Sequence, residues 1–183
     1  MEQEGKLTAN KISKLQRGVR YAVPAIASVL LIFVCIEVYN FYRLTPTRLF
    51  NEKYEAYNVT TTKDSMETSI SKAYREKKWA DVINLNANSV LSVKDVFLTG
   101  MAFLETNNLS RAISSYQVVL ADVKNDAALK DAAEYYLALA YLKNNDYDQA
   151  IELMNAIRNN SAHLYSKKFS RKYIDRVKRL KWR

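Results

Sequence analysis

One pattern of apolar residues occurs twice in this chain, and the second copy follows the first by 38 residues. The first copy reads Gly100-x-x-Phe103, Leu109-x-x-Ala112, Tyr116-x-x-Val119, and the second reads Ala138-x-x-Tyr141, Tyr147-x-x-Ala150, Met154-x-x-Ile157. In each copy a small residue allows a partner helix to approach, and the aromatic residue one turn later fills the remaining space. Helix pairs repeated at such a period cannot bury their apolar faces alone, so they stack. The pattern predicts an all-α fold of stacked helix pairs.

Glycine and proline are rare, with three glycines and two prolines in 183 residues. Tight β-hairpin turns depend on glycine, whereas helix interiors exclude both residue types. The composition therefore favours helices over strands. The single cysteine, Cys35, excludes an internal disulfide and any cluster of thiolate metal ligands.

The periodicity predicts three helix pairs joined by short turns. The predicted helices cover 65–76, 80–91, 94–106, 109–123, 127–143 and 147–158, and a short helix over 47–57 precedes them. Asp64 and Glu67 form the capping-box pattern that begins a helix. The turns are expected at 77–79, 107–108 and 144–146, and asparagine in the last two tolerates left-handed geometry.

This pattern resembles the tetratricopeptide repeat (TPR), and the segment from Tyr135 to Ile157 matches it best. The resemblance covers about residues 64–160. It implies a short α-solenoid of about three helix pairs, whose concave face is built from the first helix of each pair and binds another protein. In the first pair Val82 replaces the crossing alanine, as is typical of terminal repeats that cap a stack. The whole chain also resembles bacterial single-pass membrane proteins that carry TPRs outside the cytoplasm.

The register of the TPR family places a set of residues on the concave face. The implied partner-binding residues are Tyr74, Lys94, Phe97, Met101, Tyr135, Leu139 and Lys143, with Glu67, Ser71 and Glu105 beside them. An apolar patch rimmed by charge suits an amphipathic helix or an extended peptide of a partner. Glu67 and Ser71 stand where TPRs that bind chaperone tails need lysine and asparagine, so that activity is not implied. A second interpretation stays open, in which the chain's own final helix fills the groove.

An apolar segment at residues 21–42 is long enough to cross a lipid bilayer. At about 1.5 Å per residue such a helix reaches about 33 Å, against a hydrocarbon core of about 30 Å. Pro24 falls in the first turn, where its missing N–H costs nothing, and Cys35 lies farther along. Glu37 is the only charge, and it either reaches the headgroups or contacts another helix. The alternative is a cleaved signal peptide, but no small-x-small site follows the apolar run.

The net charge of +9 is concentrated at the two ends of the chain. Residues 1–20 carry five basic and two acidic side chains, and residues 166–183 carry nine basic and one acidic. The basic cluster at 1–20 adjoins the apolar segment, whereas the other flank offers only Arg43 and Arg48. Because the more cationic flank of a span stays in the cytoplasm, we expect a single-pass protein of the cell inner membrane. Its N-terminus would be cytoplasmic and its repeats periplasmic.

The C-terminal basic segment combines its charges with one apolar stripe. The cations are Lys167, Lys168, Arg171, Lys172, Arg176, Lys178, Arg179, Lys181 and Arg183. Phe169, Tyr173, Val177 and Leu180 recur at helical spacing, which predicts an amphipathic helix over about 163–180. Three interpretations stay open: a helix that caps the last repeat, a helix on anionic lipid, or an arm on an acidic partner surface or RNA. A periplasmic location argues against RNA.

The chain lacks the residues of common catalytic centres, because His163 is the only histidine and no glycine-rich phosphate loop exists. We therefore expect no enzyme, no cofactor and no metal site. The leading hypothesis is a membrane-anchored TPR adaptor that binds a protein partner. The alternatives are a chaperone-like factor of a protein translocon and an organelle-surface receptor with cytosolic repeats. The expected parts are a basic N-terminus (1–20), a transmembrane helix (21–42), a connector (43–63), the repeats (64–160) and a basic capping helix (161–183).

Overall fold

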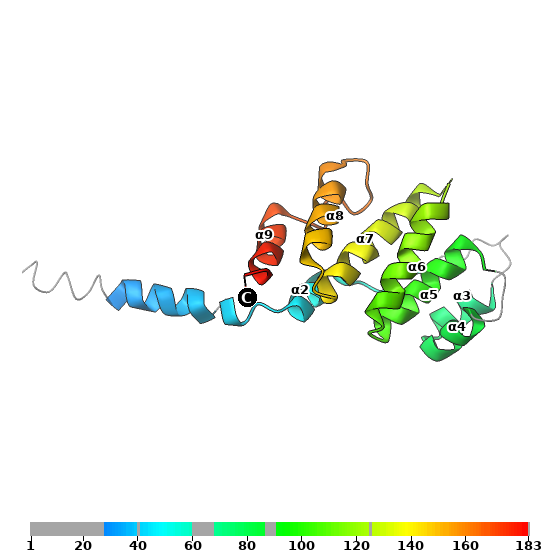
Figure 1. The fold of residues 1–183 in the computed structure, drawn as a ribbon, viewed down its shortest axis with the longest axis horizontal. Helices are drawn as coiled ribbons and strands as arrows, with labels where there is room; N and C mark the ends of the chain where they lie inside the picture. The colour runs from blue at the N-terminus through cyan, green and yellow to red at the C-terminus, as the bar shows by residue number, and fades with distance from the viewer. Residues whose placement is uncertain (1–27, 40, 60–67, 87–90, 125, 183) are drawn as a thin grey trace, which may run out of the picture. The chain divides into compact units, whose positions relative to one another are not determined.

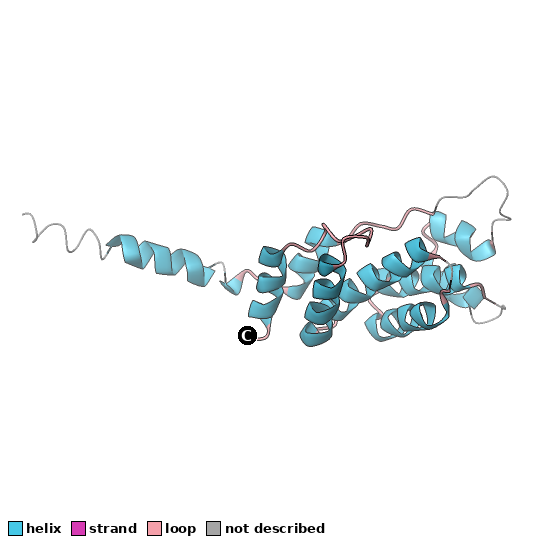
Figure 2. Ribbon diagram, turned by 90° about the horizontal axis from the view of Figure 1, so that it is seen from above, coloured by secondary structure: helices cyan, strands magenta, loops and turns pink. Residues whose placement is uncertain are grey.

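The computed structural model describes residues 28–39, 41–59, 68–86, 91–124 and 126–182 of the 183-residue chain. It consists of two units, Met1–Leu44 and Thr45–Arg183, which are described separately. The described residues form helices joined by turns and loops, with no strand among them (Figure 2). The prediction of an all-α fold is therefore confirmed for this part of the chain.

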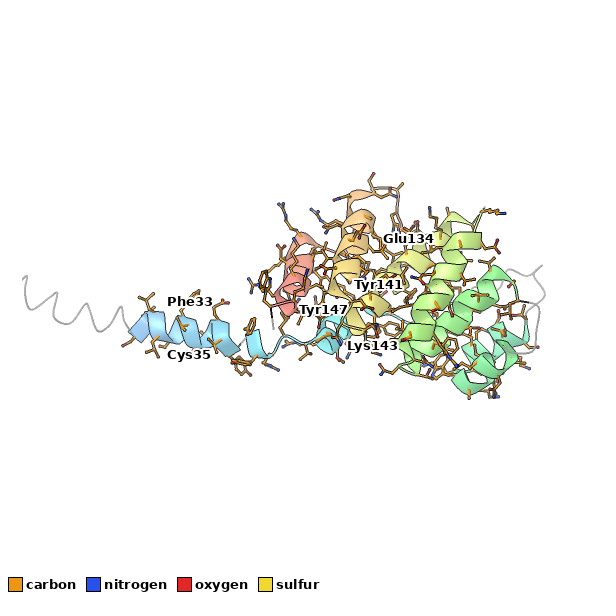
Figure 3. The ribbon with its side chains drawn as sticks, in the orientation of Figure 1. Phe33, Cys35, Glu134, Tyr141, Lys143 and Tyr147 are labelled. Atoms are coloured by element: carbon orange, nitrogen blue, oxygen red, sulfur yellow. The ribbon has the colours of Figure 1, made fainter. Side chains whose placement is uncertain are left out.

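The first unit contains a helix over residues 28–39, on which Figure 3 labels Phe33 and Cys35. All its side chains are exposed, and its large apolar ones are 48% to 66% exposed. Glu37 is also exposed on this helix. None of the described helices combines the length and the apolarity that a bilayer crossing requires. Residues 21–27, which include Pro24, and residue 40 of the predicted span lie outside the described residues.

The second unit contains the three predicted helix pairs (Figure 1). They are α3 (Ser69–Arg75) with α4 (Trp79–Asn86), α5 (Val93–Glu105) with α6 (Leu109–Asp122), and α7 (Ala127–Lys143) with α8 (Tyr147–Asn159). The members of each pair contact one another, and α4 contacts α5 as α6 contacts α7. The stack of consecutive antiparallel pairs is thus confirmed, and Asp64 and Glu67 lie outside the described residues.

Local sequence explains where these helices begin and end. Ser92 and Asp95 form a complete capping box at the start of α5, and the Asp126 side chain accepts a hydrogen bond from the Leu129 amide at the start of α7. The turn inside each pair contains one residue in the left-handed region. These residues are Lys77 (φ 56°), Asn107 (φ 59°) and Asn145 (φ 68°). The sequence predicts left-handed geometry in the two turns that contain asparagine, whereas a lysine such as Lys77 gives no indication of it.

The small residues lie at the close crossings that the pattern predicts. Gly100 is buried in α5, and Ala112 in α6 and Ala150 in α8 have no exposed surface. A Cβ atom at Gly100 would lie 2.9 Å from Cε1 of Tyr116 and 3.0 Å from Cβ of Ser115. The absence of a side chain at this position therefore sets the distance between α5 and α6.

Two further helices flank the stack. Helix α2 (Pro46–Lys53) contacts α7 and α9 (Arg171–Leu180), and α9 also contacts α8. The predicted helix over 163–180 is wrong in its first part, because residues 161–169 form turns and the Ser170 side chain caps α9. The predicted apolar stripe is buried all the same, with Phe169, Tyr173, Val177 and Leu180 at most 4% exposed.

We predict that Gly100→Ala destabilises the protein. Alanine gains about 1 kcal/mol of helix propensity over glycine, but overpacking of a close crossing costs about 1–3 kcal/mol. Thermal unfolding of the full-length protein in mild detergent, followed by circular dichroism, should show a lower midpoint. Ser114→Ala, at an exposed position of α6, is the matched control and should not lower the midpoint. An unchanged or raised midpoint for Gly100→Ala would contradict the close crossing.

Candidate functional site: the groove and its strap

The face that the TPR register assigns to a partner is covered by a segment of the chain itself. This segment, here called the strap, comprises residues 45–59: helix α2 and the extended residues 54–59 that follow it. Figure 2 shows the loop after α2 running along one face of the helix stack toward α3. The strap is therefore part of the fold of the second unit.

Four tyrosine hydroxyls hold the main chain of the strap. Here called the tyrosine ladder, they donate to successive strap carbonyls: Tyr173 to Leu49 (2.8 Å), Tyr135 to Lys53 (2.5 Å), Tyr136 to Glu55 (2.7 Å) and Tyr74 to Tyr57 (3.2 Å). The donors come from α9, α7 and α3. Glu55 and Tyr57 lie in extended backbone without a neighbouring strand and Lys53 ends α2, so their carbonyls need such donors where they are taken from water, whereas Leu49 lies within α2. Because carbonyls accept the bonds, the ladder recognises backbone rather than a particular side chain.

The side chains of the strap complete an aromatic cluster. The ring of Tyr57 lies edge-on to Phe97, with centroids 4.8 Å apart, and close to Tyr136 at 6.3 Å. Tyr54 stacks on Phe50 at 4.9 Å and donates its hydroxyl to the Glu105 carboxylate. Edge-to-face and offset ring pairs add about 0.5–1.5 kcal/mol each beyond the area they bury. Aromatic packing therefore determines which side chains suit the strap.

Charged groups lie at the edges of the strap. Glu52 pairs with Arg176 of α9 at 2.6 Å, and Glu55 pairs with Lys168 at 2.7 Å. The Lys143 ammonium lies 4.6 Å from the centroid of the Phe50 ring (Lys143 is labelled in Figure 3). Exposed ion pairs of this kind contribute about 0–1 kcal/mol each. They help to align the strap, but its stability comes from the ladder and the buried rings.

Four predicted groove residues, Tyr74, Phe97, Tyr135 and Lys143, contact the strap, so the face that they form is not open. Tyr74, Phe97, Met101, Tyr135 and Leu139 are at most 5% exposed. Lys94 and Lys143 are half-buried, and Ser71 is buried beside Thr68. The Glu105 carboxylate accepts a hydrogen bond from the Tyr54 hydroxyl. Glu67 lies outside the described residues. The expectation of an open apolar groove is therefore wrong, while contact of these residues with a partner stays a prediction.

The alternative, in which the final helix fills the groove, is also wrong for most of the length of the groove. The C-terminal segment reaches the groove only at the third pair, where Tyr165 stacks on Tyr135 at 4.3 Å and Phe169 lies 5.3 Å from it. Over the second pair the covering residue is Tyr57, which contacts Phe97. The segment that occupies most of the groove, the strap, therefore precedes the repeats in sequence.

The sequence predicts a connector at residues 43–63, which include the strap, and its repeat pattern does not single out Tyr136 or Tyr165. One signal was present, because Leu49, Phe50, Tyr54 and Tyr57 supply apolar side chains throughout a segment that a plain linker would make polar. Leu49 and Phe50 are at most 4% exposed. Aromatic residues in a supposed linker beside a repeat array therefore indicate an intramolecular occupant.

Asp131, Glu134 and His163 bring three potential metal-ligand atoms within 4.8 Å of one another. His163 Nδ1 accepts a hydrogen bond from the Tyr165 amide at 3.0 Å, which holds the ring on this loop. The buried Nε2 lies 3.2 Å from a Glu134 oxygen and 3.6 Å from an Asp131 oxygen, with no hydrogen-bond partner among the described residues. With the Leu164 amide bound to Asp131 at 2.7 Å, the cluster fastens the loop after α8 to α7.

The C-terminal cations fall into two groups. Four of them meet carboxylates, in the pairs Lys168–Glu55, Arg176–Glu52, Lys181–Asp148 and Lys178–Asp175. Lys167, Arg171, Lys172 and Arg179 have no carboxylate partner among the described residues. Arg183 lies outside the described residues. The predicted basic segment is thus partly used to hold α9 in place and partly free.

Comparison with known proteins supports the repeat family. A family model described as "Tetratricopeptide repeat" matches residues 132–162, from the body of α7 to the loop after α8. No curated protein and no solved structure matches the chain. The match falls on the third helix pair, where the predicted resemblance was strongest.

We predict that Tyr135→Phe and Tyr136→Phe each lower the free energy of unfolding by about 1–2 kcal/mol, because each leaves a partly buried carbonyl of the strap without its donor. Tyr141→Phe is the control, since its hydroxyl bonds an exposed Gln117 amide (Tyr141 is labelled in Figure 3). Limited proteolysis should cut residues 54–59 faster in the first two variants and not in the third. Equal cutting in all three would contradict the ladder.

Burial raises the pKa of all four ladder tyrosines above 10, the ordinary value. A raised folded-state pKa contributes stability that is fully present below pH 10 and is lost as the pH rises from there through the folded-state values. We therefore predict a steep loss of stability above pH 10, measured by chemical unfolding at a series of pH values. The slope should be shallower in Tyr135→Phe. Identical slopes would show that Tyr135 does not titrate with unfolding.

Proposed function

We propose that the chain, whose residues 132–162 match the model of the tetratricopeptide repeat, is a membrane-anchored scaffold that binds a protein partner. Helical repeats of this family are surfaces for protein–protein interaction, and the family is typically non-enzymatic. The observation that carries the proposal is the self-occupied groove. An aromatic face whose side-chain hydroxyls donate to main-chain carbonyls is suited to hold an extended peptide, and the peptide it holds is the chain's own strap.

The anchor in this proposal is the apolar segment 21–42. Its described part, the helix over residues 28–39, exposes large apolar side chains on all sides. A helix that is apolar all round needs a nonaqueous environment, and the acyl chains of a bilayer provide one. The only charge in the segment, Glu37, lies near its C-terminal end, where a carboxylate reaches the headgroups at a lower cost than at the centre.

The side of the membrane follows from the flanking charges. Residues 1–20 carry five cations against Arg43 and Arg48 on the other flank, so we propose that the N-terminus is cytoplasmic. The repeats then lie on the opposite side, which is the periplasm in a bacterium with two membranes. The third hypothesis, a receptor with cytosolic repeats, requires the reverse distribution of charge.

The strap determines how a partner uses the groove. A partner peptide must replace residues 54–59, which have no regular secondary structure, and take over the hydroxyls of Tyr136 and Tyr74. The tethered strap competes at high effective concentration, so only a partner with suitable aromatic side chains displaces it. A chaperone-like factor needs an open apolar groove, and the covered face does not favour that alternative.

The test is crosslinking with a membrane-impermeant reagent, applied to cells with an opened outer membrane, followed by carbonate washing and mass spectrometry. We expect the protein to stay in the washed membrane and one partner to crosslink to the helices of residues 94–143. Tyr57→Ala weakens the strap and should increase that crosslink, whereas Tyr147→Phe, on α8, should not.

Each component of the proposal has its own contrary outcome. Release by carbonate would contradict the anchor, and crosslinking only after the inner membrane is opened would contradict the topology. A partner found equally with wild type and Tyr57→Ala, on the outer faces of α6 or α8, would contradict exchange with the strap. The absence of any crosslinked protein would contradict the scaffold.

A further inference from the structure

The outward side of α9 gathers positive charge. Its other side is buried and carries Tyr173, Ile174, Val177 and Leu180. The exposed residues of the helix are Arg171, Lys172, Asp175, Lys178 and Arg179, so four cations accompany one carboxylate. Lys178 pairs with that carboxylate, while Arg171, Lys172 and Arg179 have no acidic partner among the described residues. This side of α9 therefore retains net positive charge after the internal ion pairs are formed.

An exposed tryptophan adjoins these cations. Trp182 directly follows the cap of α9 and is 85% exposed, the largest value for a large apolar side chain among the described residues. Continued at 100° per residue from α9, position 182 falls on the same side as Arg171 and Lys178. An indole in water forgoes the free energy that burial of its large apolar surface would give, so an exposed indole of this size marks a surface that a partner covers. Arginine and lysine beside tryptophan are the residues that anchor helices at a bilayer interface.

We infer that this surface, the α9 basic face (Arg171, Lys172, Arg179 and Trp182), docks on the anionic headgroups of the bilayer. The cations meet lipid phosphates, and the indole of Trp182 enters the interfacial layer. The outer side of a helix is convex and suits a planar surface. A nucleic-acid strand usually follows a groove with several stacking rings, and Trp182 is the only aromatic side chain of this face.

The inference rests on the proposed membrane anchor, which brings the bilayer within reach. Six residues lie between Tyr42 and Leu49, which gives a contour of at most about 25 Å over seven Cα–Cα steps. The Leu49 carbonyl accepts the Tyr173 hydroxyl of α9 at 2.8 Å, and Glu52 holds Arg176. The chain length therefore limits how far Leu49, which binds α9, can lie from a membrane that contains the segment ending at Tyr42.

The test uses full-length protein reconstituted in vesicles. In a Trp79→Phe background Trp182 is the only tryptophan, because the chain contains two. Its fluorescence is compared in vesicles of phosphatidylcholine alone and of phosphatidylcholine with phosphatidylglycerol, each containing a brominated lipid as quencher. We expect a blue shift and quenching of Trp182 in the anionic vesicles only, reversed by high salt.

The charge-reversed variant Arg171→Glu/Lys172→Glu/Arg179→Glu should lose the shift. Loss of three interfacial cations lowers the ratio of docked to undocked helix about a hundredfold, at about fivefold for each cation, and the added carboxylates lower it further. Lys72→Glu/Lys77→Glu/Lys124→Glu changes the net charge equally at exposed positions outside α9 and should keep the shift.

Three outcomes overturn the inference. Trp182 emission that is equal in both kinds of vesicle, with protein that floats with the vesicles, would exclude docking while leaving the anchor intact. Protein that does not float would show that the anchor itself fails. Trp182 that stays in water on anionic vesicles but is quenched by a single-stranded oligonucleotide would assign the α9 basic face to nucleic acid.

Discussion

The second unit depends on four hydrogen bonds from tyrosine hydroxyls to the backbone of the strap. Glu55 and Tyr57 lie in extended chain and Lys53 ends α2, so each of these carbonyls, once taken from water, would cost about 1–3 kcal/mol without its tyrosine donor. Phenylalanine would bury as much apolar surface but could not supply the donor. The structure therefore needs tyrosine at these positions, where a helical core in general would accept any large ring.

The strap also explains how so short a repeat array is closed. About three repeats are the minimum for a stable stack, and each end and the concave face of such a stack leave apolar surface exposed. Here α9 covers α8, and the strap covers the concave face of α5 and α7. The strap follows the apolar N-terminal segment directly in sequence. The segment that occupies the groove and the apolar segment therefore belong to one continuous stretch of chain.

Local pattern predicted the helix pairs but not what covers them. Gly100, Ala112 and Ala150 recur at a fixed period, so steric arguments were enough to place the crossings and their turns. The contact from Tyr135 to Lys53 joins residues 82 positions apart, and no local periodicity reports such a pair. A short segment with a proline between the apolar segment and the repeats reads as a connector until the donors that hold its carbonyls are known. The use of C-terminal cations to hold the strap was hidden for the same reason.

The most direct test of this account is photocrosslinking from the strap itself. Benzoylphenylalanine in place of Tyr57, in the full-length protein in its own cell, reacts with whatever its ring touches when illuminated. The account predicts crosslinks within the same chain, to the peptides that contain Phe97 and Tyr136, which lie 4.8 Å and 6.3 Å from the Tyr57 ring. Crosslinks only to lipid or to another protein, or no crosslink at all, with none to α5 or α7, would contradict the position of the strap.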